Sequence, residues 1–328
     1  MSAVLRIVAA GPAVSLQDRG RRGARRYGVS LSGPMDWASH ALALRLAGEA
    51  ADRPAFEFGP GGMTVAAENA ALRIAVAGPG AGGVLSRGGM RSVLPAPFAC
   101  VLEPGEELAV RPGLDGSWGT LAVRGLRAGD PVLGSYATNL RTGIGPPRPD
   151  KGTLYPCAPV APEPPTPYDE PLPRLHGESG FVIRLLRAPQ THLFEPASLE
   201  ALVREPFTVT RQRDRMGGRI EGPSLVAESH DIVSDALVQG AIQVPGDGQP
   251  IVQTADAAPT GGYPKIAVVA RADLPLLVQA RAPCPVRFRW IEVDAARAAA
   301  HELEKRIRTT GPRRRNPLDP DFLRAFSI

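Results

Sequence analysis

Cysteine, aromatic residues and long apolar runs are all scarce in this chain of 328 residues. Its three cysteines, Cys100, Cys157 and Cys284, are far apart and odd in number, which excludes a zinc-ligand spacing and a disulfide framework. No apolar run reaches the roughly 18 residues that a membrane-spanning helix needs. Residues 1–10 lack the basic start and long apolar stretch of a signal peptide. We therefore expect a soluble, cytoplasmic protein that contacts no membrane.

Several familiar catalytic motifs are missing as well. The sequence has no Walker A loop, no H-E-x-x-H metal motif and no dinucleotide fingerprint, and we assign no metal ligands. His230-Asp231 and Ser234-Asp235 suggest parts of a hydrolase site. No Gly-x-Ser-x-Gly elbow accompanies them, however, which argues against a serine triad.

The net charge is +5, with arginines gathered in residues 19–26 and 313–315, but aromatic residues make up only 5% of the chain. No aromatic pattern that could stack on bases accompanies these arginines. The basic charge therefore fits an anionic substrate or a protein interface better than a nucleic acid, and we expect no nucleic-acid partner.

Glycine and proline, in contrast, are abundant: 36 and 35 residues, nearly twice the ~12% of an average protein. Together with many short apolar runs, this composition predicts a mainly β protein with many turns. The candidate strands are residues 72–77, 108–111, 120–124, 181–186, 207–210, 251–255, 266–270, 276–280 and 286–290.

Two segments predict helices. Residues 35–47 can be capped by Ser32 or Asp36 and end at Gly48. Residues 295–308 follow Asp294, which we expect to cap them, and place Leu303 and Ile307 on one stripe. The segment 145–173 holds eleven prolines and predicts an extended connection between two halves. The predicted domains are therefore 1–165, 166–294 and a helix with a basic tail at 295–328.

The segments 243–251 and 260–265 are the most informative part of the chain. Glycines that allow close approach to a ligand lie beside Tyr263 and Lys265, with Asp256 a few residues before them. These side chains could bind an anion or activate a carbonyl. The alternative is a tight structural hairpin.

Two further segments carry clustered charge. Gln17, Asp18 and Arg21 could hold a carboxylate, or could lock a loop by an internal ion pair. Asp214 and Arg215 lie in an arginine-rich segment, 211–223, that is either a structural salt-bridge network or an anion-binding rim.

Taken in order, these segments resemble the biotin-dependent carboxyltransferase family, also called the allophanate hydrolase subunit 2 family, over about residues 5 to 293. The resemblance is greatest to its members that serve as the C subunit of 5-oxoprolinase. The segments that carry it are Gln17-Asp18…Gly20-Arg21, Ser32-Gly33-Pro34-Met35-Asp36, Leu133-Gly134-Ser135, Asp214-Arg215-Met216-Gly217…Arg219…Glu221-Gly222-Pro223, Gly240-Ala241-Ile242-Gln243-Val244-Pro245, Gly248-Gln249-Pro250-Ile251 and Thr260-Gly261-Gly262-Tyr263-Pro264-Lys265.

The resemblance implies two tandem cyclophilin-like β-barrels with few helices. It also implies an ATP-dependent amidohydrolase subunit that opens 5-oxoproline or a similar cyclic amide. ATP with Mg would be the cofactor, in a site shared with a partner protein. The implied partners are a 5-oxoprolinase B-subunit-like protein and a lactam-utilisation-type A subunit.

Two other functions remain open. One is the carboxyltransferase component of a urea-carboxylase-like biotin enzyme, although this chain has no Met-Lys-Met motif and so carries no biotin itself. The other is a non-catalytic regulator that antagonises a partner resembling a kinase inhibitor.

The resemblance also implies roles for residues. Asp256, Lys265, Tyr263 and Arg215 are the implied catalytic set, and a functional Lys265 is expected to share a cleft with Asp256 and Arg215. The implied substrate-binding residues are Gln17, Asp18, Arg21, Asp214, Gln243, Thr260, Gly261 and Gly262.

The chain departs from the family pattern at several positions. Ala257, Ala258 and Pro259 replace an Arg-Gln-Thr run after Asp256, and Tyr136 stands where the pattern has an arginine. Two site-like arginines are thus absent, and with them the planar anion recognition that lysine or tyrosine cannot reproduce.

Overall fold

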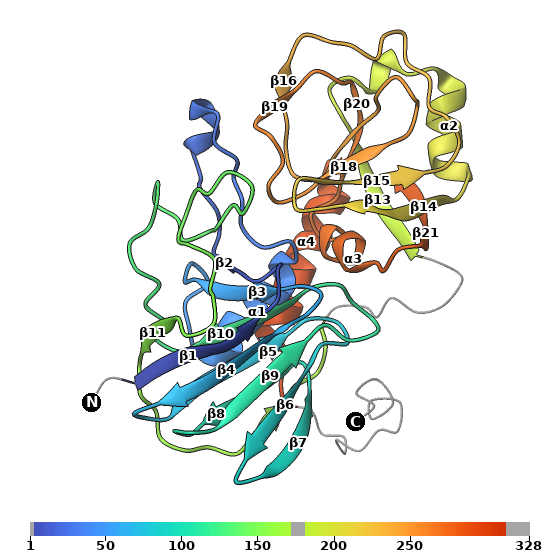
Figure 1. Ribbon diagram of the computed structural model, residues 1–328. Helices are drawn as coiled ribbons and strands as arrows, with labels where there is room; N and C mark the ends of the chain where they lie inside the picture. Colours follow the sequence, from blue (N-terminus) through green and yellow to red (C-terminus); the bar gives the residue numbers. More distant parts are fainter. Residues whose placement is uncertain (1–2, 172–180, 313–328) are drawn as a thin grey trace. The chain divides into compact units, whose positions relative to one another are not determined.

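β-strands dominate the computed structural model of the protein, which describes residues 3–171 and 181–312 (Figure 1). The chain divides into two compact units that interleave along the sequence. The first comprises Met1–Gly20, Asp36–Pro173 and Lys305–Ile328, and the second comprises Arg21–Met35 and Arg174–Glu304. The units differ from the linear domains predicted above chiefly because an early segment, Arg21–Met35, belongs to the second unit.

Two six-stranded antiparallel sheets form the first unit. In spatial order, one sheet contains β11 (Leu154–Cys157), β1 (Ala3–Ala10), β4 (Met63–Glu68), β9 (Glu107–Arg111), β6 (Gly82–Arg87) and β7 (Met90–Pro95). The other contains β12 (Thr166–Pro167), β8 (Phe98–Leu102), β5 (Leu72–Ala77), β10 (Gly119–Val123), β3 (Ala55–Phe58) and β2 (Ser15–Gln17).

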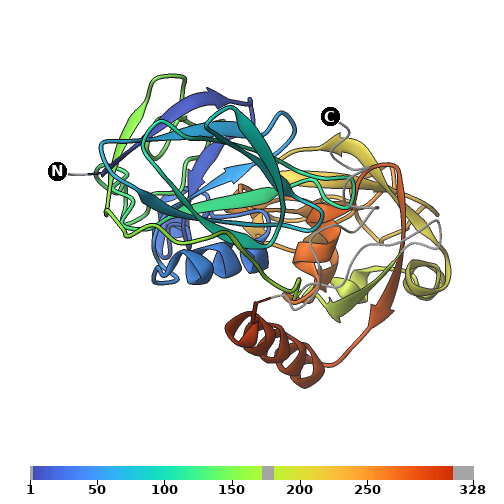
Figure 2. The same ribbon diagram turned by 90° about the horizontal axis from the view of Figure 1, so that it is seen from below.

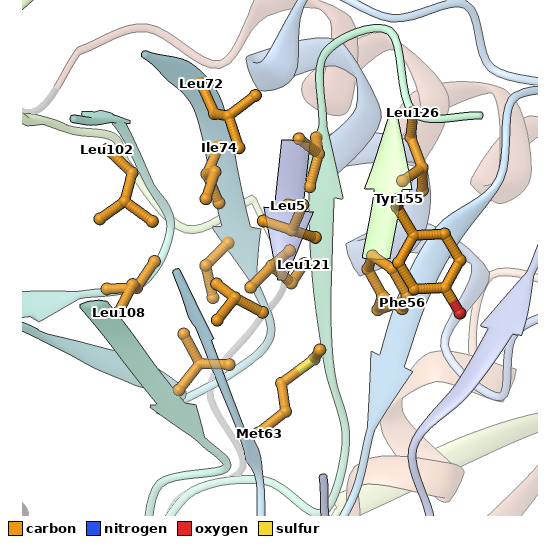
Figure 3. Close-up of a cluster of buried hydrophobic side chains, with 14 of the residues drawn as sticks. Leu5, Phe56, Met63, Leu72, Ile74, Leu102, Leu108, Leu121, Leu126 and Tyr155 are labelled. Atoms are coloured by element: carbon orange, nitrogen blue, oxygen red, sulfur yellow. The ribbon is translucent and has the colours of Figure 1, made fainter. Parts of the chain in front are cut away.

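The core of the first unit lies between these sheets. Leu5 and Leu108 from one sheet join Ile74 and Leu121 from the other in a single apolar cluster, and all four are fully buried (Figure 3). On β1 the side chains alternate between buried and half-buried, as a strand with one face on a core requires. Phe56 and Tyr155 meet edge to face, with ring centroids 5.2 Å apart.

Helix α1 (Trp37–Ala47) covers β5 and β10 in the first unit (Figure 2). Asp36 caps it, because its carboxylate accepts hydrogen bonds from the backbone N–H groups of Ala38 and Ser39. Gly48 ends it at φ 79°, a left-handed conformation that favours glycine. The predicted helix at 35–47 is confirmed, with its start two residues later.

The proline-rich segment predicted as a connection is largely part of the first unit. β11 pairs with β1, and β12 pairs with β8, each at the edge of its sheet. Edge positions suit proline because one side of an edge strand needs no ladder donor. The end of the predicted connection lies outside the described residues.

A closed barrel forms the second unit. Its strands follow the order β13 (Phe181–Arg187), β20 (Lys265–Val269), β17 (Ala241–Gln243), β18 (Ile251–Gln253), β15 (Gly217–Glu221), β14 (Phe207–Arg213) and β21 (Cys284–Trp290). The β13–β21 pair that closes it is parallel, and the others are antiparallel. Phe207 and Phe288 meet inside it, with ring centroids 5.6 Å apart. The mainly β prediction, with a β-barrel, is confirmed.

A small two-stranded sheet lies beside the barrel. It consists of β16 (Asp235–Ala236) and β19 (Thr260–Gly261), and Figure 1 shows both near β20. The second unit also contains α2 (Pro196–Arg204), α3 (Leu274–Gln279) and the 3₁₀ turns η1 (Ala24–Tyr27) and η2 (Thr191–Leu193), as well as the first part of a last helix described below.

The strand predicted at 276–280 is wrong, because residues 276–279 belong to α3 and Ala280 ends it. Pro275 lies in the first turn, where its missing N–H costs no hydrogen bond, and the N–H of Leu277 donates to the carbonyl of Asp273. A five-residue apolar run is compatible with either a buried strand or a buried helix.

The last described helix, α4 (Val293–Thr309), confirms the prediction at 295–308. Leu303 and Ile307 are buried, as their spacing predicts. Asp294 lies inside the first turn instead of at the capping position. No helix in the two described ranges combines the length and the apolar character needed to cross a membrane.

Packing around Phe56 generates a stability prediction. Phe56→Ala removes a fully buried ring and its contact with Tyr155, so the free energy of unfolding should fall by about 3–5 kcal/mol. Leu154→Ala is the matched control, since Leu154 lies beside Tyr155 on β11 but is 54% exposed and should change stability by no more than ~0.5 kcal/mol. Urea unfolding of both variants measures the difference, and equal losses would contradict the assigned core.

Candidate functional site

A buried ion pair between Arg215 and Asp256 lies at the centre of the second unit's site. Arg215 occupies the turn between β14 and β15, and Asp256 follows β18. The Arg215 Nε atom is 2.9 Å from Asp256 Oδ2, and Nη2 is 3.3 Å from Oδ1. Both side chains are less than a tenth exposed. The two bonds fix the guanidinium and carboxylate in one plane, a geometry that lysine cannot reproduce.

The early segment Arg21–Met35 is attached to this pair within the second unit. Arg215 Nη2 donates to the Gly33 carbonyl at 2.5 Å, and Ser30 Oγ donates to the Asp256 carbonyl at 3.2 Å. Arg21 is fully buried, and its backbone N–H donates to the Leu31 carbonyl. Arg21 therefore belongs to the second unit, whereas Gln17 and Asp18, its neighbours in the predicted triplet, belong to the first.

In the first unit, Asp18 is held by a turn from a distant part of the chain. Its Oδ1 accepts from the Gly20 N–H at 2.9 Å and from Ser135 Oγ at 2.6 Å, and its Oδ2 accepts from the Tyr136 N–H at 2.7 Å. Tyr136 binds Asp18 through its backbone N–H, so this hydrogen bond forms even though tyrosine replaces the arginine of the family pattern. Leu133, in the same turn, has φ 52°, a strained conformation for leucine.

Gln17 belongs to the same arrangement. Its Nε2 donates to Ser15 Oγ at 2.8 Å and to the Thr138 carbonyl at 2.9 Å, and the side chain is fully buried. Its Oε1 has no hydrogen-bond partner among the described residues. The fixed amide therefore presents one unused acceptor, as an amide-reading residue would.

His40, which the sequence analysis missed, lies close enough to Asp18 for the two to interact electrostatically. It projects from α1, is 3% exposed, and neither ring nitrogen has a partner within residues 3–171 or 181–312. Burial lowers the pKa of His40 to about 4, and the Asp18 charge only partly opposes this effect. His40 is thus a neutral imidazole at pH 7, placed among the alanines and leucines of a helix where no motif marks it.

Lys265 forms a second ion pair, away from the partners expected for it. It opens β20 and is 3% exposed, and its Nζ lies 2.6 Å from Asp235 Oδ2. The ion pair of Lys265 is thus with Asp235, and the shared cleft with Asp256 and Arg215 stays a prediction. Asp256 binds Arg215, and Asp235, which the sequence analysis noted only beside Ser234, binds Lys265.

The Asp235 carboxylate is only half-buried but strongly bound. Gln190 Nε2 donates to Oδ2 at 2.9 Å, and the Ala236 N–H donates to Oδ1 at 2.7 Å. The hydrogen bond from Lys265 is the largest cause, ahead of those from Gln190 and Ala236, that lowers the pKa of Asp235 to about 2. The carboxylate stays ionised at any physiological pH.

A chain of amides runs next to Lys265. Gln243 is the register partner of Lys265 across β17 and β20. Gln253 Nε2 donates to Gln243 Oε1 at 2.9 Å, and Gln243 Nε2 donates to the Tyr263 carbonyl at 3.1 Å. Tyr263 contributes this carbonyl, while its side chain is 42% exposed. Because Gln243 accepts at Oε1 and donates from Nε2, these two hydrogen bonds fix the orientation of its side-chain amide.

Gly261 must be a glycine because the backbone approaches Gln243 closely. A Cβ atom there would lie 2.7 Å from Gln243 Nε2 and 2.9 Å from a Leu237 methyl group. Thr260 is exposed on β19, and the Gly262 carbonyl accepts from the Ile232 N–H at 2.8 Å. These three residues place the β19 segment over the amide chain.

The remaining predicted residues are structural in their described contacts. Asp214 is exposed, and its Oδ1 accepts from the N–H groups of Met216 and Gly217, which shapes the β14–β15 turn. Among the departures, Ala257 is buried and the Pro259 carbonyl accepts from the Leu237 N–H.

Known proteins share this sequence pattern over most of its length. The family model described as "Carboxyltransferase domain, subdomain A and B" matches residues 27–290. The chain is 32% identical over 307 residues to the 5-oxoprolinase C subunit of Escherichia coli (strain K12), a match that covers 92% of this chain and 96% of that protein. It is 33% identical over 294 residues to the 5-oxoprolinase C subunit of Haemophilus influenzae, covering 86% and 89%.

A solved structure supports the fold. The crystal structure of the K. lactis urea amidolyase matches with a TM-score of 0.82 at 24% identity, over 97% of this chain and 20% of that chain. At this identity the likeness concerns architecture alone.

The Arg215–Asp256 pair gives a prediction for stability. Arg215→Met leaves the Asp256 carboxylate buried without its main cation, so the free energy of unfolding should fall by about 3–5 kcal/mol. The double variant R215M/D256L removes both charges and should recover much of that loss. Urea unfolding of both variants tests this. A double variant no more stable than R215M would contradict the assignment, because the unpaired buried carboxylate would then have no cost.

His40 gives a prediction for pH dependence. Above pH 6.5 the imidazole is neutral in the folded and unfolded chain and has no effect. As the pH falls from 6.5 towards 4, the unfolded chain binds a proton that the folded chain excludes, so stability declines by on the order of 3 kcal/mol in total. His40→Leu should flatten this decline relative to the wild type, whereas the exposed control His301→Leu should not. Urea unfolding at pH 7.5, 5.5 and 4.5 measures the slopes, and parallel curves for His40→Leu and wild type would refute the assignment.

Proposed function

The chain belongs to the family of the carboxyltransferase domain, subdomains A and B, and we propose that it is one subunit of an ATP-dependent 5-oxoprolinase. The observation that supports this most is its 32–33% identity to two 5-oxoprolinase C subunits over nearly the full length of both chains. The proposed reaction opens 5-oxoproline, or a similar cyclic amide, to the amino acid. The proposed partners are a 5-oxoprolinase B-subunit-like protein and a lactam-utilisation-type A subunit.

The chemistry requires activation of an unreactive amide. A lactam carbonyl is a poor electrophile, and phosphorylation of its oxygen by ATP would create a good leaving group for attack by water. Cations and N–H donors would stabilise the negative charge on the transferring phosphoryl group and on the carbonyl oxygen. Ring opening would then yield glutamate, ADP and phosphate.

The described residues suggest how this chain would contribute. Gln243, whose amide is fixed by hydrogen bonds within the second unit, would recognise the amide of the substrate. Lys265 would bind anionic oxygen, and the Tyr263 segment would shape the site. Arg215 and Asp256 bind each other through two hydrogen bonds, so we assign them a positioning role.

Nucleotide binding is assigned to a site shared with a partner protein. The sequence has no Walker A loop. Within the described ranges, Arg215 and Lys265 already pair with Asp256 and Asp235. Neither cation is thus available to ATP phosphates unless a carboxylate moves away, which makes a phosphate-binding contribution from the partner the simpler arrangement.

The test is reconstitution. The chain is co-purified with its two proposed partners, and glutamate release from 5-oxoproline is measured with ATP and Mg. We expect glutamate and ADP in equal amounts, and none when ATP or any one protein is omitted. A complex that forms but releases no glutamate would exclude the proposal. If the chain instead carboxylates urea from a biotin carrier, it is a carboxyltransferase component. Partner binding without any turnover would favour the regulatory role.

A variant connects this activity to the site. Lys265→Ala should lower ATP-coupled turnover by about a hundredfold, the usual effect of removing one charge-stabilising group. Lys151→Ala is the control, because Lys151 is exposed in a turn of the first unit. Full turnover in Lys265→Ala would show that the lysine does not belong to the reaction site.

A further inference from the structure

The Lys265–Asp235 pair is asymmetric in a way that sets it apart from the Arg215–Asp256 pair. The Lys265 side chain is 3% exposed, whereas its partner Asp235 is 45% exposed. A buried ammonium is thus neutralised by a carboxylate that reaches it from the surface.

The segment that carries Asp235 is attached to the barrel by few contacts. Apart from the contacts of Asp235, residues 229–238 are joined to the rest of the unit by the two-residue pairing of β16 with β19 and by four hydrogen bonds. The N–H groups of Ile232 and Leu237 donate to the Gly262 and Pro259 carbonyls, the His230 ring Nδ1 bonds to the Val244 carbonyl, and the Ala241 N–H donates to the Val238 carbonyl. Leu237 is its one buried side chain, and Val233 is 92% exposed. A segment with so little buried apolar surface opens at low free-energy cost compared with the barrel strands.

The groups around the Asp235 carboxylate form a set that suits a small acid. Lys265 Nζ and Gln190 Nε2 both donate to Asp235 Oδ2. Gln190 Oε1 is buried and has no hydrogen-bond partner in the described part of the chain. An ammonium and an amide N–H therefore converge on one carboxylate oxygen, and an unused acceptor lies on the same amide.

We propose that Asp235 occupies a carboxylate-binding site as an internal stand-in, and that a small-molecule carboxylate takes its place on Lys265 and Gln190 when residues 229–238 lift away. The unused Gln190 oxygen indicates that this ligand also carries an N–H next to its carboxylate. The identification of the ligand rests on the proposed function, since 5-oxoproline has its carboxylate on the carbon that bears the ring N–H.

In this arrangement Asp235 and the free ligand compete for Lys265 and Gln190. Asp235 is tethered to the site, so a free ligand must displace it, and the apparent affinity falls by the fraction of molecules in the open state. The ligand keeps the Lys265 ammonium paired throughout, which avoids leaving a buried charge alone. Asp235 also excludes neutral amides and weak anions, because these would not compensate for the lost ion pair.

The binding experiment uses the full chain and two probes of similar shape that differ in charge. L-5-Oxoproline and its neutral primary amide are titrated by calorimetry into wild type, Asp235→Asn and Asp231→Asn. Asp231 lies on the same segment, is exposed, and has no side-chain contact with Lys265, so its variant removes the same charge without opening the site. We expect Asp235→Asn to bind 5-oxoproline at least tenfold more tightly than wild type, with no gain for the amide and none in Asp231→Asn. Adding Lys265→Met to Asp235→Asn should abolish the gain.

Other outcomes overturn the proposal. Equal affinity of Asp235→Asn and wild type for 5-oxoproline would do so, as would an equal gain for the amide or in Asp231→Asn. If Asp235→Asn does not fold, the wild type still decides. Saturating 5-oxoproline should accelerate hydrogen exchange of the Ile232 and Leu237 amides, and unchanged or slower exchange would refute displacement.

Tighter binding without glutamate release in the reconstituted complex would keep the carboxylate site and reject the proposed function. Glutamate release by the complex, together with equal affinity of Asp235→Asn and wild type for 5-oxoproline, would keep the proposed function and reject the carboxylate site.

Discussion

The buried contact between Arg215 and Asp256 is the interaction on which the second unit depends. It joins the β14–β15 turn to the chain after β18, and the same guanidinium binds Gly33 from the early segment Arg21–Met35. A buried carboxylate without its cation would cost several kcal/mol, so these three parts of the chain are fixed together or not at all. The Asp256 carbonyl also accepts a hydrogen bond from Ser30. Asp256 therefore binds the early segment through its backbone and Arg215 through its side chain.

The second ion pair has the opposite character. Lys265 and Asp235 are as close as Arg215 and Asp256, yet one carboxylate is buried and the other is half in water. Burial of both partners makes a rigid joint, because separating them in place would leave two buried charges unpaired. Exposure of one partner allows exchange, since water can solvate Asp235 when it departs. The two pairs thus divide structural and ligand-directed tasks within one barrel.

Local features of the fold followed from the sequence. The cap at Asp36, the end at Gly48 and the strand at 72–77 depend on neighbouring residues alone, and the structure confirms them. The strand predicted at 286–290 lies in β21, where the buried Val286 and Phe288 alternate with the exposed Arg287 and Arg289. The short apolar run in α3 carries no such periodicity, and for this reason its helix was mistaken for a strand.

The pairing of side chains within the site could not be predicted from neighbouring residues in the sequence. Asp256 lies nine positions before Lys265, and that proximity suggested a contact, but the barrel places Asp256 against Arg215, 41 positions away. Asp235 lies 30 positions from Lys265 in the sequence, and the pairing of β16 with β19 brings them together. No pattern of residues predicts this pairing. His40 was missed because a histidine in an apolar helix has no sequence signature until its burial is known. The motif pointed to Gln17 and Asp18 as candidates, whereas the hydrogen bond from Ser135 to Asp18 could be known only from the fold.

The interleaving of the two units has a consequence for synthesis on the ribosome. The segment Arg21–Met35 leaves the ribosome before the rest of its own unit, because Arg215 and Asp256 follow it by roughly 200 residues. At about 5–20 residues per second, it waits on the order of ten to forty seconds for its binding partners. During that interval its arginines and its glycine-rich turns have only the nascent first unit and the surrounding factors to contact. The second unit is therefore completed by a piece that emerges first, and a fragment that begins after Pro173 would be translated without it.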